Sequence, residues 1–219
     1  MELFSIFLKG GMIMWFILAC SIIGLTVIID RYIVIRKARI NVPAFMVRIR
    51  GMLKKKYISG AISYCMEEKS PVANIIRKGL TKYKLGHERV KEAIENAGTQ
   101  EISKLEKGLA ILASVSGIAP LLGFLGTVTG MISAFMRIED LQGAANPSDL
   151  AGGIWEALIT TAFGLAVGIT AFIFYNYLLS SISKLVSEME IISNDVVDVI
   201  EEVNTGKTNK IDEEIEIDI

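Results

Sequence analysis

One acidic residue lies within the segments 10–29, 108–136 and 151–183, which are otherwise free of charge, together with threonines at a comparable depth. The acid is Glu156, and the threonines are Thr127, Thr160 and Thr161. An ionisable group among apolar residues is costly to bury, so it marks a candidate functional site. A hydroxyl can donate a hydrogen bond to a carboxylate or accept one from its acid form. These residue types could therefore interact with a titrating carboxyl group.

The spacing of the threonines suggests that two of them share a layer. Thr127 lies nine residues from Met136, at the outer end of its predicted span, and Thr161 lies ten residues from Ala151, at the outer start of the next predicted span. At about 1.5 Å per residue, both would lie roughly 14 Å below the outer surface. Glu156 is about 140° around the helix from Thr161 and shares its face with Thr160.

Two alternatives to a functional site stay open at this point. Each threonine hydroxyl could instead bond to a carbonyl of its own helix, as Ser and Thr in membrane helices often do. Glu156 follows two glycines closely and could lie near enough to the outer surface to reach water.

Small residues recur at four-residue spacing in the same two stretches. The pairs are Gly126 with Gly130 and Gly164 with Gly168. In lipid, where the hydrophobic effect does not drive helices together, such faces allow close backbone packing. The spacing predicts a tight helical bundle or oligomer.

The elements that would carry these residues are membrane helices. The 219 residues are 52% hydrophobic with a mean hydropathy of +0.47, which exceeds the usual composition of a soluble domain. Three uncharged stretches, 10–29, 108–136 and 157–183, reach the roughly 20 residues needed to span a bilayer. None alternates as barrel strands do. We therefore predict an all-α membrane protein with three transmembrane helices and long helices extending into a helical cytoplasmic region.

The charge distribution predicts an orientation. Of the 23 Lys and Arg residues, 18 lie in 30–107 against 8 acids, which gives this segment a net charge of +10. The positive-inside rule places it in the cytoplasm, with the N-terminus outside and the C-terminus inside. The predicted order is a periplasmic N-terminus (1–9), a first transmembrane helix (10–29), a cytoplasmic helical segment (30–107), a second transmembrane helix (108–136), a periplasmic loop (137–150), a third transmembrane helix (151–183), a cytoplasmic helix extension (184–203) and an acidic disordered tail (204–219).

Apolar spacing in the polar segments also predicts helices. In 30–107 they are expected to break near Pro43 and Pro71, and after the third span apolar residues recur every three to four positions from Leu185 to Val203. Acids interleave the basic residues at helical spacing, so a solvated face is expected and no nucleic-acid partner.

No pattern in the sequence predicts an enzyme. The chain contains one histidine, and it has no metal-ligand spacing, phosphate-binding loop or nucleophile elbow. We predict no catalytic residues, no metal and no cofactor. Cys20 and Cys65 lie in a membrane and a cytoplasmic segment, so no disulfide framework is implied.

Two motifs carry a family resemblance. APLLGFLGTVTGM, which begins at Ala119, and WEALITTAFGL, which begins at Trp155, resemble the MotA/TolQ/ExbB proton channel family. The similarity is greater to ExbB and TolQ than to MotA, since three spans are predicted here rather than four. The resemblance implies a multi-pass protein of the bacterial inner membrane. It implies that five copies form a ring lined by the second and third spans. The ring would enclose the single membrane helices of two ExbD- or TolR-like partners, whose Asp carries the proton.

The motif match also implies roles for individual residues. Thr127 and Thr161 correspond to pore-lining threonines, Glu156 to the membrane glutamate, and Pro120 also matches. Thr160 departs from the pattern, because the family more usually has a small apolar residue there; which of the two adjacent hydroxyls faces the lumen stays open. Glu156 would tune the path or hold the ring together.

The function implied is that of a ring subunit in a motor driven by the proton motive force. Proton flow through the subunit and its partner would be coupled to energy transduction across the envelope. Two alternatives are a passive membrane scaffold for partner assembly and a transporter subunit.

Overall fold

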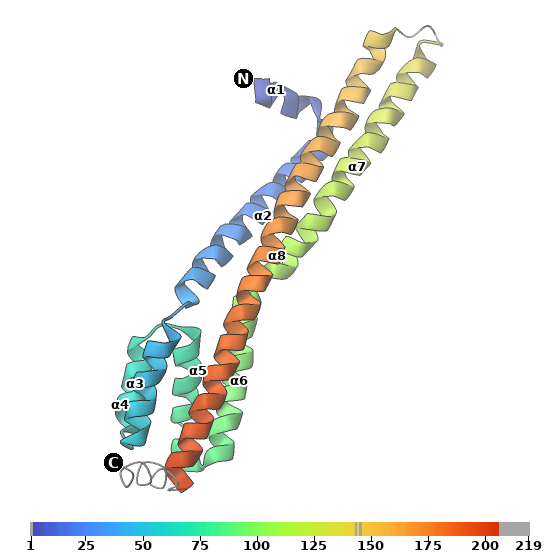
Figure 1. The fold of residues 1–219 in the computed structure, drawn as a ribbon. Helices are drawn as coiled ribbons and strands as arrows, with labels where there is room; N and C mark the ends of the chain where they lie inside the picture. Colours follow the sequence, from blue (N-terminus) through green and yellow to red (C-terminus); the bar gives the residue numbers. More distant parts are fainter. Residues whose placement is uncertain (1, 143, 145, 206–219) are drawn as a thin grey trace, which may run out of the picture. The chain divides into compact units, whose positions relative to one another are not determined.

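The described part of the chain is entirely helical in a computed structural model (Figure 1), which describes residues 2–142, 144 and 146–205. The elements are α1 (Glu2–Lys9), α2 (Gly11–Ala38), α3 (Val42–Lys54), α4 (Ile58–Glu67), α5 (Pro71–Leu80), the 3-10 turn η1 (Tyr83–Leu85), α6 (His87–Glu106), α7 (Leu109–Asp140) and α8 (Pro147–Thr205). The predicted acidic tail lies outside the described residues from 206 onward.

Proline, glycine and capping residues mark the starts of the helices. The predicted breaks near Pro43 and Pro71 are confirmed, since α3 and α5 begin there with a proline in the first turn. The Ser70 hydroxyl caps α5 by accepting a hydrogen bond from the Ala73 N–H at 3.2 Å. Gly108, with a φ of +84°, separates α6 from α7. A left-handed φ of this kind is tolerated by glycine and ends a continuous helix.

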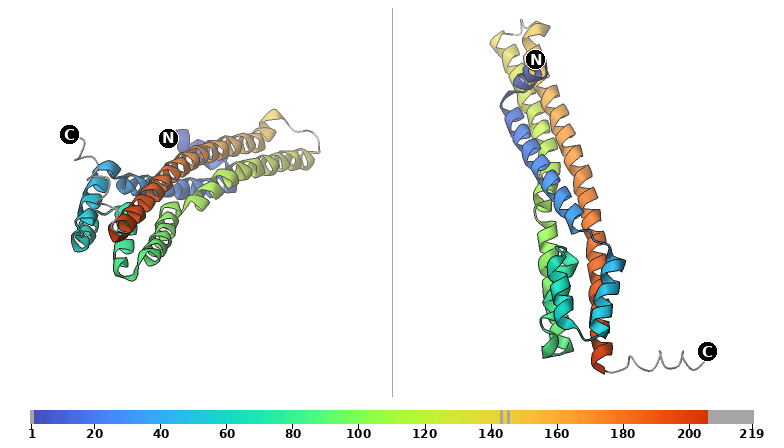
Figure 2. Two further views of the ribbon diagram at one scale, coloured as in Figure 1. Left: turned by 60° about the horizontal axis from the view of Figure 1, so that its bottom comes forward. Right: turned by 90° about the vertical axis from the view of Figure 1, so that its left-hand side faces the viewer.

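Three helical segments are long and apolar enough to cross a membrane, judged by length and composition. They contain α2, α7 and the first part of α8, as predicted. The chain divides into two compact units, each described here by itself. The membrane unit comprises the residues up to Tyr32 together with Gly108–Leu179. Within it, α7 and α8 run antiparallel and side by side (Figures 1 and 2).

The second unit comprises Ile33–Lys107 and the residues from Ser180 onward, and we call it the polar unit. Its core consists of large aliphatic side chains, of which the most deeply buried are Ile49, Leu53, Ile75, Ile76, Leu80, Ile182, Ile192 and Ile200. The apolar positions predicted from Leu185 to Val203 on α8 are buried. Leu85, which lies in the η1 turn rather than on a helix face, is 63% exposed.

Candidate functional site

Helices α7 and α8 meet through a line of glycines. We call this contact the glycine seam and define it by Gly123, Gly126, Gly130, Gly153, Gly164 and Gly168. A methyl group added at Gly130 would lie 2.5 Å from the carbonyl oxygen of Gly153, and one added at Gly164 would lie 2.6 Å from that of Ala119. Such distances leave no room for a side chain, so backbone packs directly on backbone, as is typical of membrane helices.

The seam includes the predicted packing residues and extends beyond them. Gly126, Gly130, Gly164 and Gly168 all belong to it, and a methyl group at Gly168 would overlap the Pro120 ring. The prediction missed Gly123 and Gly153. One step of three positions back from Gly126 reaches Gly123, and three steps of three or four positions back from Gly164, through Thr160 and Ala157, reach Gly153.

Thr160 lies within the seam. Its side chain is fully buried against Gly126, at an exposed fraction of 0%. Its hydroxyl donates to the carbonyl of Glu156 at 2.7 Å, the back-bonding alternative considered from the sequence. In this position Thr160 packs α8 against α7 and offers no accessible hydroxyl.

Thr161 and Thr127 are both half-buried, and both hydroxyls have a carbonyl partner. The Thr161 hydroxyl donates across the seam to the Gly123 carbonyl at 3.0 Å. The Thr127 hydroxyl donates to the Phe124 carbonyl of its own helix at 2.5 Å. Each oxygen retains acceptor capacity, because a hydroxyl has two lone pairs in addition to its donor.

Helix geometry shows which side of the seam each residue occupies. A helix turns about 100° per residue, so Leu122 and Thr127 lie on opposite flanks of the α7 stripe, and Phe163 and Thr161 lie on opposite flanks of the α8 stripe. Leu122 and Phe163 pack against the cluster formed by Met14 and Ile17 of α2 together with Ile159 of α8. Thr127 and Thr161 therefore lie together on the side of the seam that α2 does not cover.

The register between α7 and α8 gives the relative levels of Thr127 and Thr161 along the helix axes. Its contacts place Thr127 level with Leu158 and Thr161 level with Phe124. The two threonines are thus separated by about three residues, or roughly 4.5 Å, along the helix axes. They lie about one turn apart rather than in one layer. The prediction counted depth along each helix separately, from Met136 and Ala151, whereas the relative level of the two residues depends on the register between α7 and α8.

Glu156 lies on the other side of the seam, towards α2. A methyl group at Gly11 would lie 2.5 Å from the Glu156 Oε1 atom, so the carboxyl group abuts the turn between α1 and α2. Gly11 has a φ of +64°, which makes this turn possible. The Lys9 Nζ atom lies 5.5 Å from the centre of the ring of Trp155, the residue that precedes Glu156. The structure does not bring Glu156 together with Thr161.

Comparison with known proteins decides the family. A profile of the MotA/TolQ/ExbB proton channel family matches residues 67–191, which is more than half of the chain and includes both threonines and the seam. The chain belongs to the MotA/TolQ/ExbB proton channel family. Its members are channel proteins and not enzymes, which agrees with the prediction of a non-enzymatic membrane protein.

Relatives in this family come from diverse organisms. An ExbB homologue of Methanothermobacter thermautotrophicus is 30% identical over 189 residues, covering 86% of this chain and 67% of that protein. An ExbB-like protein of Synechocystis is 31% identical over 207 residues, covering 87% and 78%. The biopolymer transport protein ExbB of Xanthomonas campestris is 37% identical over 111 residues, covering 51% and 44%.

One solved structure also matches this chain. It is the flagellar MotAB stator complex of Bacillus subtilis, with a TM-score of 0.45 and 18% identity. The alignment covers 89% of this chain and 86% of that one.

Proposed function

We propose that this chain is the ring-forming subunit of an ExbB/TolQ-like motor in the bacterial inner membrane. Five copies would surround the single membrane helices of an ExbD- or TolR-like partner, with the N-terminus outside and the C-terminus inside. A membrane Asp of the partner would carry the proton past Thr127 and Thr161, and its passage would drive rotation or force across the envelope.

This proposal rests on one observation: Thr127 and Thr161 lie on the same side of the glycine seam. Helix α2 covers one flank of the glycine seam with large apolar side chains. The two half-buried threonines lie on the flank left open within one subunit. In a ring lined by α7 and α8, this open flank is the surface that would face a partner helix.

The hydroxyl geometry favours one protonation state of the passing group. The hydroxyl hydrogens of Thr127 and Thr161 are engaged with carbonyls. A protonated Asp can donate to either oxygen without disturbing these bonds. A carboxylate needs a donor, so the hydroxyl would have to leave its carbonyl at a cost of about 1 kcal/mol. The open flank would therefore pass the neutral acid more easily than its charged form.

Glu156 takes a different part in this proposal. Its carboxyl group lies at the start of α2, where the first N–H groups of a helix carry partial positive charge. It would hold the α1–α2 turn against α8 and so stabilise the subunit. Of the two roles considered for Glu156 from the sequence, this position supports the structural one.

Proton flux into liposomes tests the proposal, with the chain reconstituted alone and together with its candidate partner. We expect flux that needs the partner and falls about tenfold in Thr161→Ala, the effect of losing one hydrogen bond in a rate-limiting step. Thr161→Ser keeps the hydroxyl and should retain most of the flux.

Thr170→Ala is the matched control. Thr170 lies on α8 and, like Thr127, bonds back to its own helix, donating to the Ala166 carbonyl at 2.8 Å. It lies beside the α2 residues Ser21 and Gly24, on the flank that α2 covers. Equal flux in Thr161→Ala, Thr170→Ala and the unmodified chain would remove the threonines from the path and leave a scaffold as the better description.

A further inference from the structure

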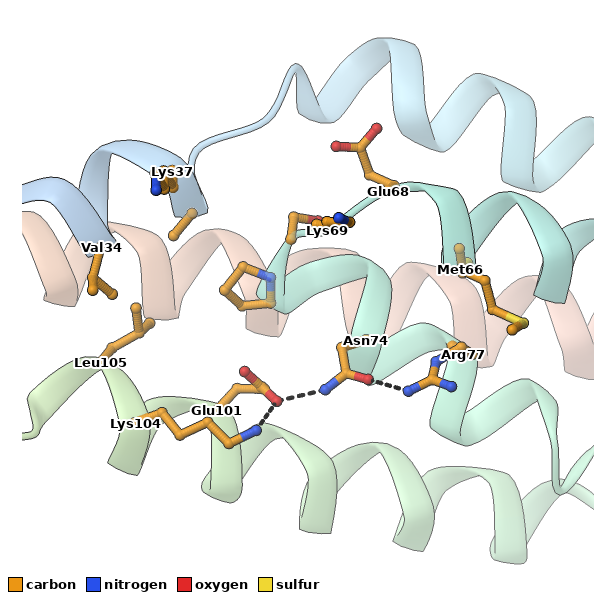
Figure 3. A pocket seen from close by; sticks show the side chains of 14 residues that line it. Val34, Lys37, Met66, Glu68, Lys69, Asn74, Arg77, Glu101, Lys104 and Leu105 are labelled. Carbon is orange, nitrogen blue, oxygen red and sulfur yellow. Dashed lines mark hydrogen bonds and ion pairs between the residues drawn. The ribbon is translucent and has the colours of Figure 1, made fainter.

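The polar unit contains a cavity that the proposed motor does not use. It measures about 580 Å³ and opens between the end of α2, the α4–α5 connection and α6 (Figure 3). This volume falls within the roughly 300–1,000 Å³ of typical small-molecule sites. We call it the basic cavity, after its charged lining residues Lys37, Glu68, Lys69, Arg77, Glu101 and Lys104.

A hydrogen-bonded network forms one wall of the basic cavity. Glu101 is only 8% exposed and accepts from the Asn74 amide at 2.5 Å and from the Lys104 ammonium at 2.7 Å. Arg77 in turn donates to the Asn74 carbonyl at 2.6 Å. Figure 3 shows these side chains linked along the wall in the order Lys104, Glu101, Asn74, Arg77. The buried carboxylate is thus compensated by Lys104 and contributes little net charge.

The remaining lining charges are mainly positive. Lys37, Lys69 and Arg77 face a single further acid, Glu68. Among the described residues, neither Lys37 nor Lys69 forms an ion pair. Burial raises the pKa of the Cys65 thiol to about 12, although nearby Arg77 opposes the shift, so this lining residue adds no negative charge at neutral pH. The cavity is therefore suited to an anion.

Two apolar side chains, Val34 and Leu105, line one end of the basic cavity, which we call the apolar end. Figure 3 shows Lys37 and Lys104 next to them and Arg77 at the other end. Val34 is on α2, five residues after the last residue of the first apolar stretch. Leu105 is near the end of α6, three residues before Gly108. Both segments lead directly into membrane helices, so the apolar end is formed by the parts of the polar unit nearest in sequence to the spans.

Apolar side chains close in sequence to the spans, with positive side chains around them, match the two parts of a phospholipid. We propose that the basic cavity binds the phosphate headgroup of an anionic phospholipid of the cytoplasmic leaflet. Lys37 and Lys69 would contact the phosphate, and Val34 and Leu105 would contact the first methylenes of the acyl chains. Lys and Arg residues that follow closely after a membrane span attract such lipids. The proposal rests on the cytoplasmic placement of this segment, which belongs to the proposed function.

Native mass spectrometry of the full chain in detergent tests the site, with phosphatidylglycerol and phosphatidylcholine as probes. We expect selective retention of phosphatidylglycerol and a loss of affinity of about thirtyfold in the double variant Lys37→Gln/Lys69→Gln. The control is Lys54→Gln/Lys55→Gln, which removes the same charge from two exposed lysines outside the cavity. An equal loss in both double variants would overturn the proposal, since attraction would then be general.

A second variant tests the apolar end without changing charge. Val34→Trp should fill the space beside Leu105 and weaken phosphatidylglycerol binding, and unchanged binding would contradict the proposed pose. Glycerol phosphate is added as a soluble competitor. If it displaces the lipid at equal concentration, the site recognises a soluble phosphate and the lipid assignment is wrong.

The lipid assay is independent of the motor. Binding is measured without a partner or a proton gradient. Selective binding with no proton flux would overturn the proposed function alone, whereas flux without selective binding would overturn the lipid site alone.

Discussion

The helices inside the membrane unit pack through small side chains, whereas those inside the polar unit pack through large ones. Helix α8 contributes to both units. In the membrane unit α8 presents Gly153, Ala157, Thr160 and Gly164 to α7, and backbones touch. In the polar unit the same helix presents Leu, Met, Ile and Val. Burial of large apolar surface is favourable in water but not in lipid. In the membrane unit, close van der Waals contact between the helices must therefore take the place of the hydrophobic effect. A single helix thus changes its packing chemistry where its surroundings change.

The largest expected effect is on the aliphatic core of the polar unit. Ile76 is fully buried. Ile76→Ala should lower the free energy of unfolding by about 3 to 4 kcal/mol, because it removes buried methylenes and leaves a cavity. Urea unfolding of the full chain in detergent measures this. Ile22→Ala in α2, where the side chain is 58% exposed, is the control and should cost far less. Similar losses would contradict the distinction between the two units.

The next effect concerns the glycine seam, where adding atoms should destabilise the fold, as removing atoms does in the core. Gly164→Ala places a methyl group 2.6 Å from the Ala119 carbonyl oxygen and 2.9 Å from the Gly123 Cα atom. We expect a loss of about 2 to 3 kcal/mol, since backbone atoms cannot move aside cheaply. The thermal unfolding temperature in detergent should fall accordingly.

Gly117→Ala is the matched control for the seam. Nothing lies within 4 Å of a methyl group added at Gly117, which lies inside α7 and more than two turns from its start. There the substitution should be neutral or stabilising by up to about 1 kcal/mol through helix propensity. Equal changes in stability for Gly164→Ala and Gly117→Ala would show that the seam does not depend on close contact between the two backbones.

The reactivity of the Cys65 thiol measures how far water penetrates the polar unit at this position. Since burial raises its pKa from 9.0 to about 12, the folded chain should hold roughly a hundredth or less of the thiolate of the unfolded chain at pH 8.5. Iodoacetamide labelling, read by peptide mass spectrometry, should be correspondingly slow until the chain is denatured. Fast labelling in the folded state would show that water reaches this position.

The same shift fixes the sign of a pH effect. Between about pH 9 and pH 12 the unfolded chain has lost the Cys65 proton and the folded chain has kept it. Stability should therefore fall with rising pH over this range. Cys65→Ser should flatten the fall in a pH series of unfolding curves.

The smallest effect is expected at the surface of the polar unit. Arg50 and Asp195 form a 2.8 Å ion pair between α3 and α8, with side chains 48% and 41% exposed. Asp195→Asn should change stability by no more than about 0.5 kcal/mol, and less at high salt, because exposed pairs are screened. A change above 2 kcal/mol would mean that the pair fixes the position of α8.

Features that depend on neighbouring residues could be predicted from the sequence. The spans, the proline breaks and the aliphatic stripe of α8 follow from local periodicity. The assignment of Thr160 to the seam could not be predicted, since it depends on the register between α7 and α8 and residues 126 and 160 lie far apart in the chain. The same is true of Glu156, whose neighbour Gly11 belongs to another helix. The turn at Gly11 and the network around Glu101 arise from contacts that no spacing within one segment encodes.

The uninterrupted length of α8 has a consequence for how this family can change over time. Because α8 runs from Pro147 to Thr205 without a break, one residue inserted at its middle would rotate everything after it by about 100°. The aliphatic stripe would then turn away from its core. The path through α6 and α7 has Gly108 as a joint, which can absorb such a change. Insertions and deletions that survive in related sequences should therefore gather around this joint and the interhelical loops, and spare the centre of α8.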